Sequence, residues 1–146
     1  MKLIPLTIAT LLALPIAANA QVFSDVRAYG TSCGTIQILP EHALIGQNQK
    51  WVVNTKNKDA TSGFYALGVK RTNFNIGGGC TIYLEPVAVF GWTSKASGIS
   101  TLTFPVPNNT ALLKVKFLIQ TTARNTTEHA VSRGIEITIG NKKPEE

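Results

Sequence analysis

The sequence has little of the chemistry that catalysis and metal binding require. It holds two histidines and two cysteines, and its aspartates are Asp25 and Asp59. His42 and His129 lie far apart in the chain and match no zinc spacing, and the scattered carboxylates match no calcium loop. Nucleophilic catalysis needs a base beside the nucleophile, and no Ser-His-Asp set stands out. We therefore expect no catalytic residue, no metal site and no cofactor.

Paired carboxylates are scarce as well. Glycoside hydrolysis needs two carboxylates about 5–10 Å apart, and the candidates are Glu41, Glu85, Glu128 and Glu136. Glu85 and Glu136 fall on outward positions of alternating segments, where a solvated carboxylate is the ordinary interpretation. A small secreted hydrolase is therefore the weakest functional hypothesis.

Long hydrophobic runs are absent except at the start of the chain. Met1 and Lys2 precede an apolar run over residues 3–16, and Ala18-Asn19-Ala20 follows. This order is typical of a secretory signal peptide, and the run is too short for a membrane span. We expect a cleaved segment over 1–20, a single domain over 21–140 and a flexible charged tail over 141–146. Export to the periplasm, cell surface or medium permits disulfides.

A dense basic stripe is also missing, although the formal net charge is +6. The basic residues are spread along the chain, whereas a nucleic-acid-binding surface gathers them beside stacking aromatics. We expect no nucleic-acid partner. The excess of positive charge indicates an ordinary solvated surface. The alternative is that this charge helps the protein adhere to anionic glycans or to an anionic cell surface.

What the chain does contain is a series of short segments with strand periodicity. They span residues 22–28, 35–40, 50–55, 64–69, 81–85, 87–93, 99–104, 113–120 and 134–140. Their spacing and the turn residues between them predict a single antiparallel β-sandwich, Ig-like or jelly-roll-like, with about nine strands. Residues 64–69 and 87–93 are apolar on both sides, so we expect covered faces and a central position for 87–93. A short helical turn over 128–132 is a further candidate.

The most informative stretch begins at three consecutive glycines, residues 77–79. Cys80 follows, and then Ile82 and Leu84 alternate with Thr81, Tyr83 and Glu85 until Pro86 ends or bends the strand. The glycines predict a turn, with an anion-binding nest as the alternative. The only other cysteine is Cys33, and an exported chain favours a Cys33–Cys80 disulfide, which would stabilise the fold by about 4 kcal/mol.

Aromatic residues supply the candidate ligand contacts. Carbohydrate binding commonly uses exposed aromatic platforms, and the candidates are Tyr83, Trp92 and Tyr65. The strand pattern places Trp51 inward and favours a core position for Trp92. Tyr83 is the best outward candidate, with cross-strand packing as the alternative.

Two sites, at Asn108 and Asn125, match the glycosylation acceptor pattern. They matter only in a eukaryotic secretory pathway, and a bacterial source would make them ordinary loop residues.

An ordered set of short motifs resembles the small secreted β-sandwich modules of planctomycete and myxobacterial surface proteins. The motifs span nearly the whole chain after residue 20, and they are YGTSC (29–33), IGQ (45–47), WVVN (51–54), FYALG (64–68), GCTIYL (79–84), FPVPN (104–108) and SRGIEITIG (132–140). The resemblance implies the sandwich and the paired cysteines. It implies no substrate and no catalytic residue. In that family the module usually sits at the C-terminus of longer exported proteins.

Two non-catalytic hypotheses follow. The first is a cell-surface or extracellular binding module whose ligand is a polysaccharide or a surface protein. The second is a structural subunit that self-associates by donating the segment Gln21–Ala28 to the sheet edge of a neighbour.

Overall fold

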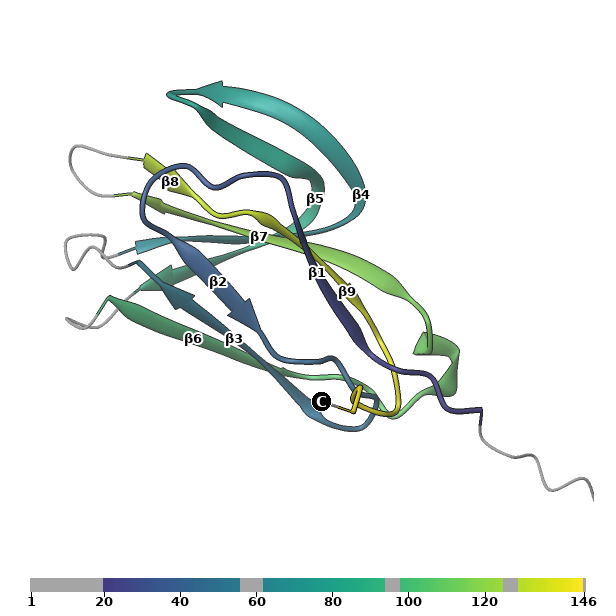
Figure 1. Ribbon diagram of the computed structural model, residues 1–146. Coiled ribbons are helices and arrows are strands. Elements are labelled where there is room, and N and C mark those ends of the chain that lie inside the picture. Colours follow the sequence, from purple (N-terminus) through teal and green to yellow (C-terminus); the bar gives the residue numbers. More distant parts are fainter. Residues whose placement is uncertain (1–19, 56–61, 94–97, 125–128, 146) are drawn as a thin grey trace, which may run out of the picture.

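Two antiparallel sheets face each other in this protein (Figure 1). The structure is a computed structural model that describes residues 20–55, 62–93, 98–124 and 129–145. The larger sheet has the order β1-β9-β7-β4-β5, with β8 paired to β7, and the smaller sheet has the order β2-β3-β6. The elements are β1 (Asp25–Tyr29), β2 (Gln37–Pro40), β3 (Asn48–Asn54), β4 (Ser62–Gly77), β5 (Cys80–Thr93), β6 (Ile99–Pro105), the 3-10 turn η1 (Thr110–Leu112), β7 (Lys116–Arg124), β8 (His129–Val131) and β9 (Gly134–Thr138). The expected antiparallel β-sandwich is confirmed.

Alternation along the strands builds the core between the two sheets. Trp51 on β3 and Ile137 on β9 are 1% and 0% exposed. The ring centroid of Trp51 lies 4.5 Å from that of Phe104 and 5.8 Å from that of Tyr65. The inward position predicted for Trp51 is therefore confirmed, and Ile137 is buried in the same core.

The strands of the β4–β5 hairpin extend beyond the part of the larger sheet with which they pair. β4 pairs with β7 only from Ser62 to Gly68, and beyond that point the hairpin arches over the sheet (Figure 1). The register shifts on both sides of Gly68, which pairs with Pro86. A Cβ atom at Gly68 would lie 2.4 Å from the carbonyl oxygen of Glu85, so the bend requires glycine there. Pro86 bends the strand rather than ending it, and we call residues 69–85 the arm.

Buried residues outside the main core lie on the arm and on β7. Leu84 of the arm and Leu118 of β7 are 0% and 3% exposed, but neither belongs to the cluster between the sheets. The Gln120 side chain accepts a hydrogen bond from the Tyr83 N–H at 2.9 Å and donates one to the Thr81 carbonyl at 2.9 Å. The arm therefore hydrogen-bonds to a β7 side chain where it no longer pairs with the β7 backbone.

The predicted disulfide between Cys33 and Cys80 is present. It joins the start of β5, in the arm, to the segment between β1 and β2. Cys33 also exchanges backbone hydrogen bonds with Val131 of β8, at 2.9 and 3.0 Å. The arm is thus tied both to the first part of the chain and to the larger sheet.

The central position predicted for residues 87–93 is wrong. They form the second half of β5, which pairs only with β4 among the described strands and is an edge. Val87 and Val89 are 65% and 56% exposed. The expectation that both faces of 64–69 are covered is also wrong, since Phe64 and Val69 are exposed. In these two strands, the presence of apolar residues on both faces therefore indicates an exposed apolar patch and not two covered faces.

The helical turn expected over 128–132 is wrong over the described residues of that range. His129–Val131 forms β8, which pairs with the end of β7, because strand pairing overrides weak local preference. Residues 113–115 precede β7, and the strand continues to Arg124, although its second half was expected to be a polar connection.

The two ends of the described chain lie together. The Ser24 N–H donates to the carbonyl of Lys142 at 2.9 Å, and the Asn141 N–H donates to that of Val22 at 2.8 Å. β1 pairs with β9 along its whole length, so the segment expected to be donated lies in the chain's own fold. Apart from residue 20, the expected signal peptide lies outside the described residues. Nowhere in the described ranges is there a helix of the length and hydrophobicity that crossing a membrane requires.

Candidate functional site

Two of the aromatic residues predicted as ligand contacts lie in the core. Tyr65 and Trp92 are 1% and 6% exposed. The Trp92 indole N–H donates to the Thr121 hydroxyl at 2.9 Å. Neither ring presents its face to solvent, so these two side chains form no platform for a sugar.

Tyr83 fastens the arm to the segment after β1. Its hydroxyl accepts a hydrogen bond from the Thr31 N–H at 3.0 Å and lies 3.0 Å from the Thr31 hydroxyl. The hydrogen bonds from Thr31 lower the pKa of Tyr83 below its ordinary value. The ring packs so closely on Gly30 that a Cβ atom there would lie 2.4 Å from it. Tyr83 therefore packs on a segment outside the strands, which is not the cross-strand packing that the sequence offered as the alternative.

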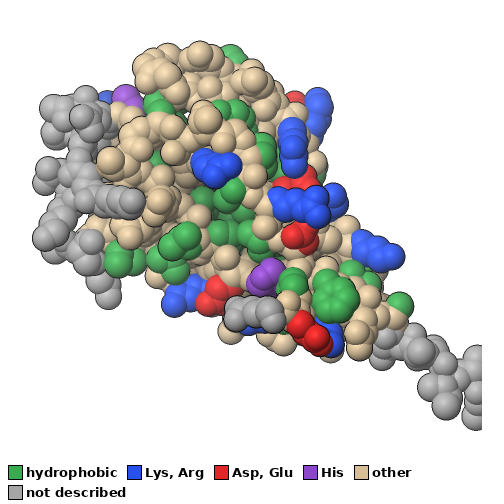
Figure 2. All heavy atoms as spheres, viewed as in Figure 1, with side chains coloured by type: hydrophobic (Ala, Val, Ile, Leu, Met, Phe, Trp, Pro, Cys, Tyr) green, Lys and Arg blue, Asp and Glu red, His purple; other side chains and the backbone are tan. Residues whose placement is uncertain are grey.

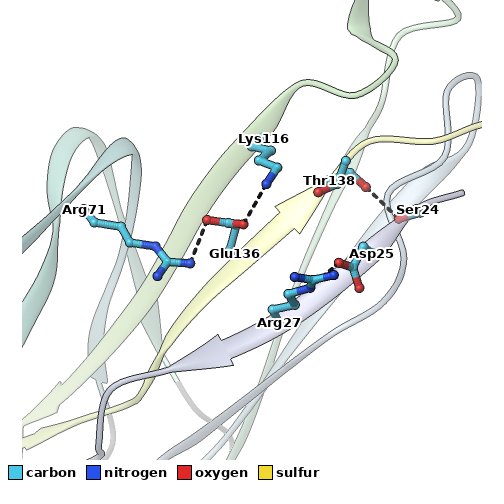
Figure 3. Close-up of polar contacts among 7 residues, drawn as sticks. All are labelled: Ser24, Asp25, Arg27, Arg71, Lys116, Glu136 and Thr138. Atoms are coloured by element: carbon cyan, nitrogen blue, oxygen red, sulfur yellow. Dashed lines mark hydrogen bonds and ion pairs between the residues drawn. The ribbon is translucent and has the colours of Figure 1, made fainter. Parts of the chain in front are cut away.

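Charged residues on the outer face form a closed cluster. Arg71 of the arm and Lys116 of β7 converge on the Glu136 carboxylate, at 2.8 and 3.2 Å (Figure 3). Burial raises the pKa of Glu136, but the hydrogen bonds from Arg71 and Lys116 outweigh burial and lower it. The Arg71 guanidinium also lies 4.2 Å from the ring centroid of Tyr29. This cluster ties the arm to β7, β9 and β1.

Two carboxylates of the hydrolase hypothesis, Glu85 and Glu136, form ion pairs with basic side chains. Glu136 is held by the two cations, and Glu85 pairs with Lys70 at 3.0 Å. Basic and acidic side chains lie interspersed over the face of the molecule shown in Figure 2. No group of three or more metal-ligating side chains occurs within the described ranges. Glu128 lies outside the described residues.

Exposed apolar side chains concentrate on the β4–β5 hairpin. The large ones in its two strands are Phe64, Val69, Phe74, Ile76, Val87, Val89 and Phe90. An exposed apolar patch of this kind typically marks a contact surface. Among the described elements, the hairpin is therefore the best candidate for a ligand-binding or protein-binding surface.

A groove of about 510 Å³ runs between the tip of the arm and the outer face of the larger sheet. Ile76 of the arm and Phe64 of β4 lie on it, and Val131 of β8 contributes to its apolar lining. A hollow of about 400 Å³ continues it past Ile76 toward the glycines at the tip of the hairpin. The groove exists because the arm bends over the sheet.

Two basic side chains line the groove, Arg124 at the end of β7 and His129 at the start of β8. Arg124 is exposed and makes no ion pair with any residue that the structure describes. Apolar walls beside an exposed guanidinium fit an apolar ligand that carries a negative charge.

Sequence reasoning missed this groove, because the bend brings together segments that are far apart in the chain. Gly68 and Pro86 are the signal that could have found it. Each residue alone marks a bulge or an interruption of a strand, but only their pairing across the hairpin shows that both strands bend at one point.

No protein-family model matches the chain, and no curated protein is similar to it at a statistically significant level.

Proposed function

We propose that this protein is an exported, non-catalytic binding module that holds an extended segment of another surface protein in the groove beneath the arm. The observation that carries the proposal is the groove, with Phe64 and Ile76 on its apolar walls and, at its edge, Arg124, which has no ion-pair partner among the described residues. The bound segment would carry apolar side chains and at least one acidic side chain.

The groove is preformed, which favours binding. The Cys33–Cys80 disulfide and the hydrogen bonds of Gln120 hold the arm in place. A site that is ordered before its ligand arrives loses less conformational freedom when the ligand binds. The structural links of the arm therefore support a binding role.

A protein segment fits the groove better than a polysaccharide does. A sugar ring could stack on Phe64, but sugar hydroxyls placed against Ile76 and Val131 would lose water without gaining hydrogen-bond partners. An acidic side chain would instead meet Arg124, which adds specificity and speeds the encounter. We therefore favour the surface protein among the two ligand classes.

The self-assembling structural subunit is the second candidate. β1 is an edge strand of the larger sheet, so its free side offers backbone groups to a neighbour. The ion pair between Asp25 and Arg27 on this strand (Figure 3) weakens the case, because charges on an edge strand discourage strand addition.

The test uses anilinonaphthalene sulfonate, a fluorescent apolar anion with the chemistry that the groove should prefer. We expect the exported, oxidised protein to bind the dye. Ile76→Ser should weaken binding about tenfold, because it removes apolar contact area, and Arg124→Gln should weaken it by up to about fivefold. Val87→Ser and Lys50→Gln are the matched controls, since both residues are exposed and lie outside the groove. Dye binding that neither groove variant weakens would contradict the proposed site.

Competition with peptides then tests the ligand class. A short extended peptide of apolar and acidic residues should displace the dye, and the same peptide with lysines in place of the acidic residues should not. If soluble cell-wall polysaccharide displaces the dye and neither peptide does, the groove would still be the binding site, but the proposal of a protein ligand would be wrong.

A further inference from the structure

The outer edge of β5 is the least protected sheet edge among the described strands. Residues 87–93 contain no charged side chain, and β5 pairs only with β4 there. The other edges carry features that block strand addition. β1 has the Asp25–Arg27 ion pair, β2 is short and ends at Pro40, and β6 ends at Pro105. β8 is a strand of 3 residues whose Val131 forms a bridge with Cys33.

This edge also exposes large apolar side chains. Val87, Val89 and Phe90 are 65%, 56% and 48% exposed. An edge strand presents a row of unpaired backbone donors and acceptors to any chain that approaches it. A long, uncharged and apolar edge is therefore a site at which another strand can add.

We infer that the edge of β5 pairs antiparallel with the same edge of a second copy of this chain, which forms a two-fold dimer. The distribution of charge favours contact at this uncharged edge. The formal net charge is +6, so two copies repel each other over most of their surface. Residues 87–93 let them approach without placing like charges in contact.

The side chains along the edge are self-complementary about Val89. In an antiparallel pair the backbone donors and acceptors alternate in direction, so a two-fold pairing centred on one residue matches them. Centred on Val89, the pairing sets Phe90 opposite Ala88 of the second copy and Val87 opposite Gly91. Phe90 and Val87 thus each meet a small residue, and Val89 meets Val89 of the second copy. The space over Gly91 is open to the described residues, since none of them beyond its chain neighbours has an atom within 4 Å of the position that a Cβ atom would take.

The dimer is closed, because a two-fold contact uses the same edge of both copies and leaves no second β5 edge to extend it. It would join the two larger sheets into one continuous sheet and present two arm grooves. Two linked grooves would strengthen binding to a surface that carries many copies of the ligand. The dimer does not depend on the proposed ligand, because it uses different residues.

The first test is the mass of the exported, oxidised protein in solution by sedimentation equilibrium. We expect the wild-type protein to have twice the monomer mass and Val89→Lys to have the monomer mass. Val69→Lys is the matched control, since Val69 is 69% exposed on the same hairpin but lies in the arm, and it should remain a dimer. A wild-type monomer at every concentration, or a Val89→Lys dimer, would overturn the inference. Val89→Lys should still unfold cooperatively in denaturant, which shows that the variant is folded. It should also bind anilinonaphthalene sulfonate as the wild-type protein does, which separates this test from that of the groove.

The second test fixes the register. Under mild oxidation Val89→Cys should form a covalent dimer, because residue 89 faces its own copy across the pair at a distance that a disulfide spans. Gly91→Cys should not, because it lies on the same face but opposite residue 87. Equal crosslinking of both variants would overturn the Val89-centred register.

Discussion

Gln120 is a buried amide that serves as a joint between two parts of the fold. It is 1% exposed, and its side chain also donates to the Ser132 carbonyl at 2.8 Å. The alternation of residues 113–120 predicted that Gln120 points away from the core, which it does. The sequence does not predict its burial, because the arm that covers it is more than thirty residues earlier in the chain.

We predict that Gln120→Leu lowers the free energy of unfolding by about 2–3 kcal/mol, because the Tyr83 N–H and two carbonyls lose their partner. Denaturant unfolding of the variant and the wild type measures the difference. Gln37→Leu is the control, since Gln37 is exposed on β2, and it should change stability by no more than about 0.5 kcal/mol. Equal effects of the two substitutions would show that the Gln120 bonds do not hold the arm.

Glu136 makes the stability of the arm depend on pH. Its pKa is lowered in the folded protein from the ordinary value of 4.5, so the folded state favours the ionised form. The stabilisation is present above pH 4.5 and is lost as the pH falls through the lowered pKa.

We predict that the stability difference between the wild-type protein and Glu136→Gln is present at neutral pH and shrinks as the pH falls to about 3. Unfolding by denaturant across this range measures both proteins. Glu85→Gln is the control, because Glu85 has a single exposed ion pair with Lys70, and it should have a small effect at either pH. A difference that stays constant with pH would contradict the role given to Glu136.

At the scale of elements, the strands that face the core follow from the sequence and the arm does not. Ile135 and Ile137 flank the polar Glu136, Trp51 shares a strand face with Val53, and all of these apolar residues are buried. Residues 87–93 look like a central strand because they are apolar on both sides, but periodicity cannot tell a covered face from an exposed patch. The groove depends on a bend in both strands of one hairpin. No local sequence pattern predicts against which part of the sheet a bent hairpin packs.

We predict that Cys33→Ser/Cys80→Ser lowers the free energy of unfolding by about 2–4 kcal/mol. The bond closes a loop with a sequence separation of 47, and removing it frees the unfolded chain. The double variant should also bind anilinonaphthalene sulfonate more weakly, because the arm loses one of its anchors. Reduction of the wild-type protein is the control and should reproduce both effects. Unchanged dye binding at reduced stability would show that the other contacts alone fix the arm.

At the scale of the whole molecule, the two sheets support a hairpin that carries two separate surfaces. Its arm forms the groove with β7 and β8, and its sheet half forms the open edge of β5. The sandwich itself could be predicted from strand spacing and turn residues. The division of the hairpin into two surfaces could not be predicted from the sequence, because it depends on the bend at Gly68 and Pro86.

The location of the bound ligand tests the central claim most directly. We would titrate the ¹⁵N-labelled, oxidised protein with anilinonaphthalene sulfonate and follow the backbone amide signals by nuclear magnetic resonance. The account predicts saturable shifts at Phe64, Ile76, Thr122, Arg124 and Ala130, which come from four separate segments of the chain and all line the groove. Shifts confined to residues outside the groove, or no saturable shift at all, would contradict it.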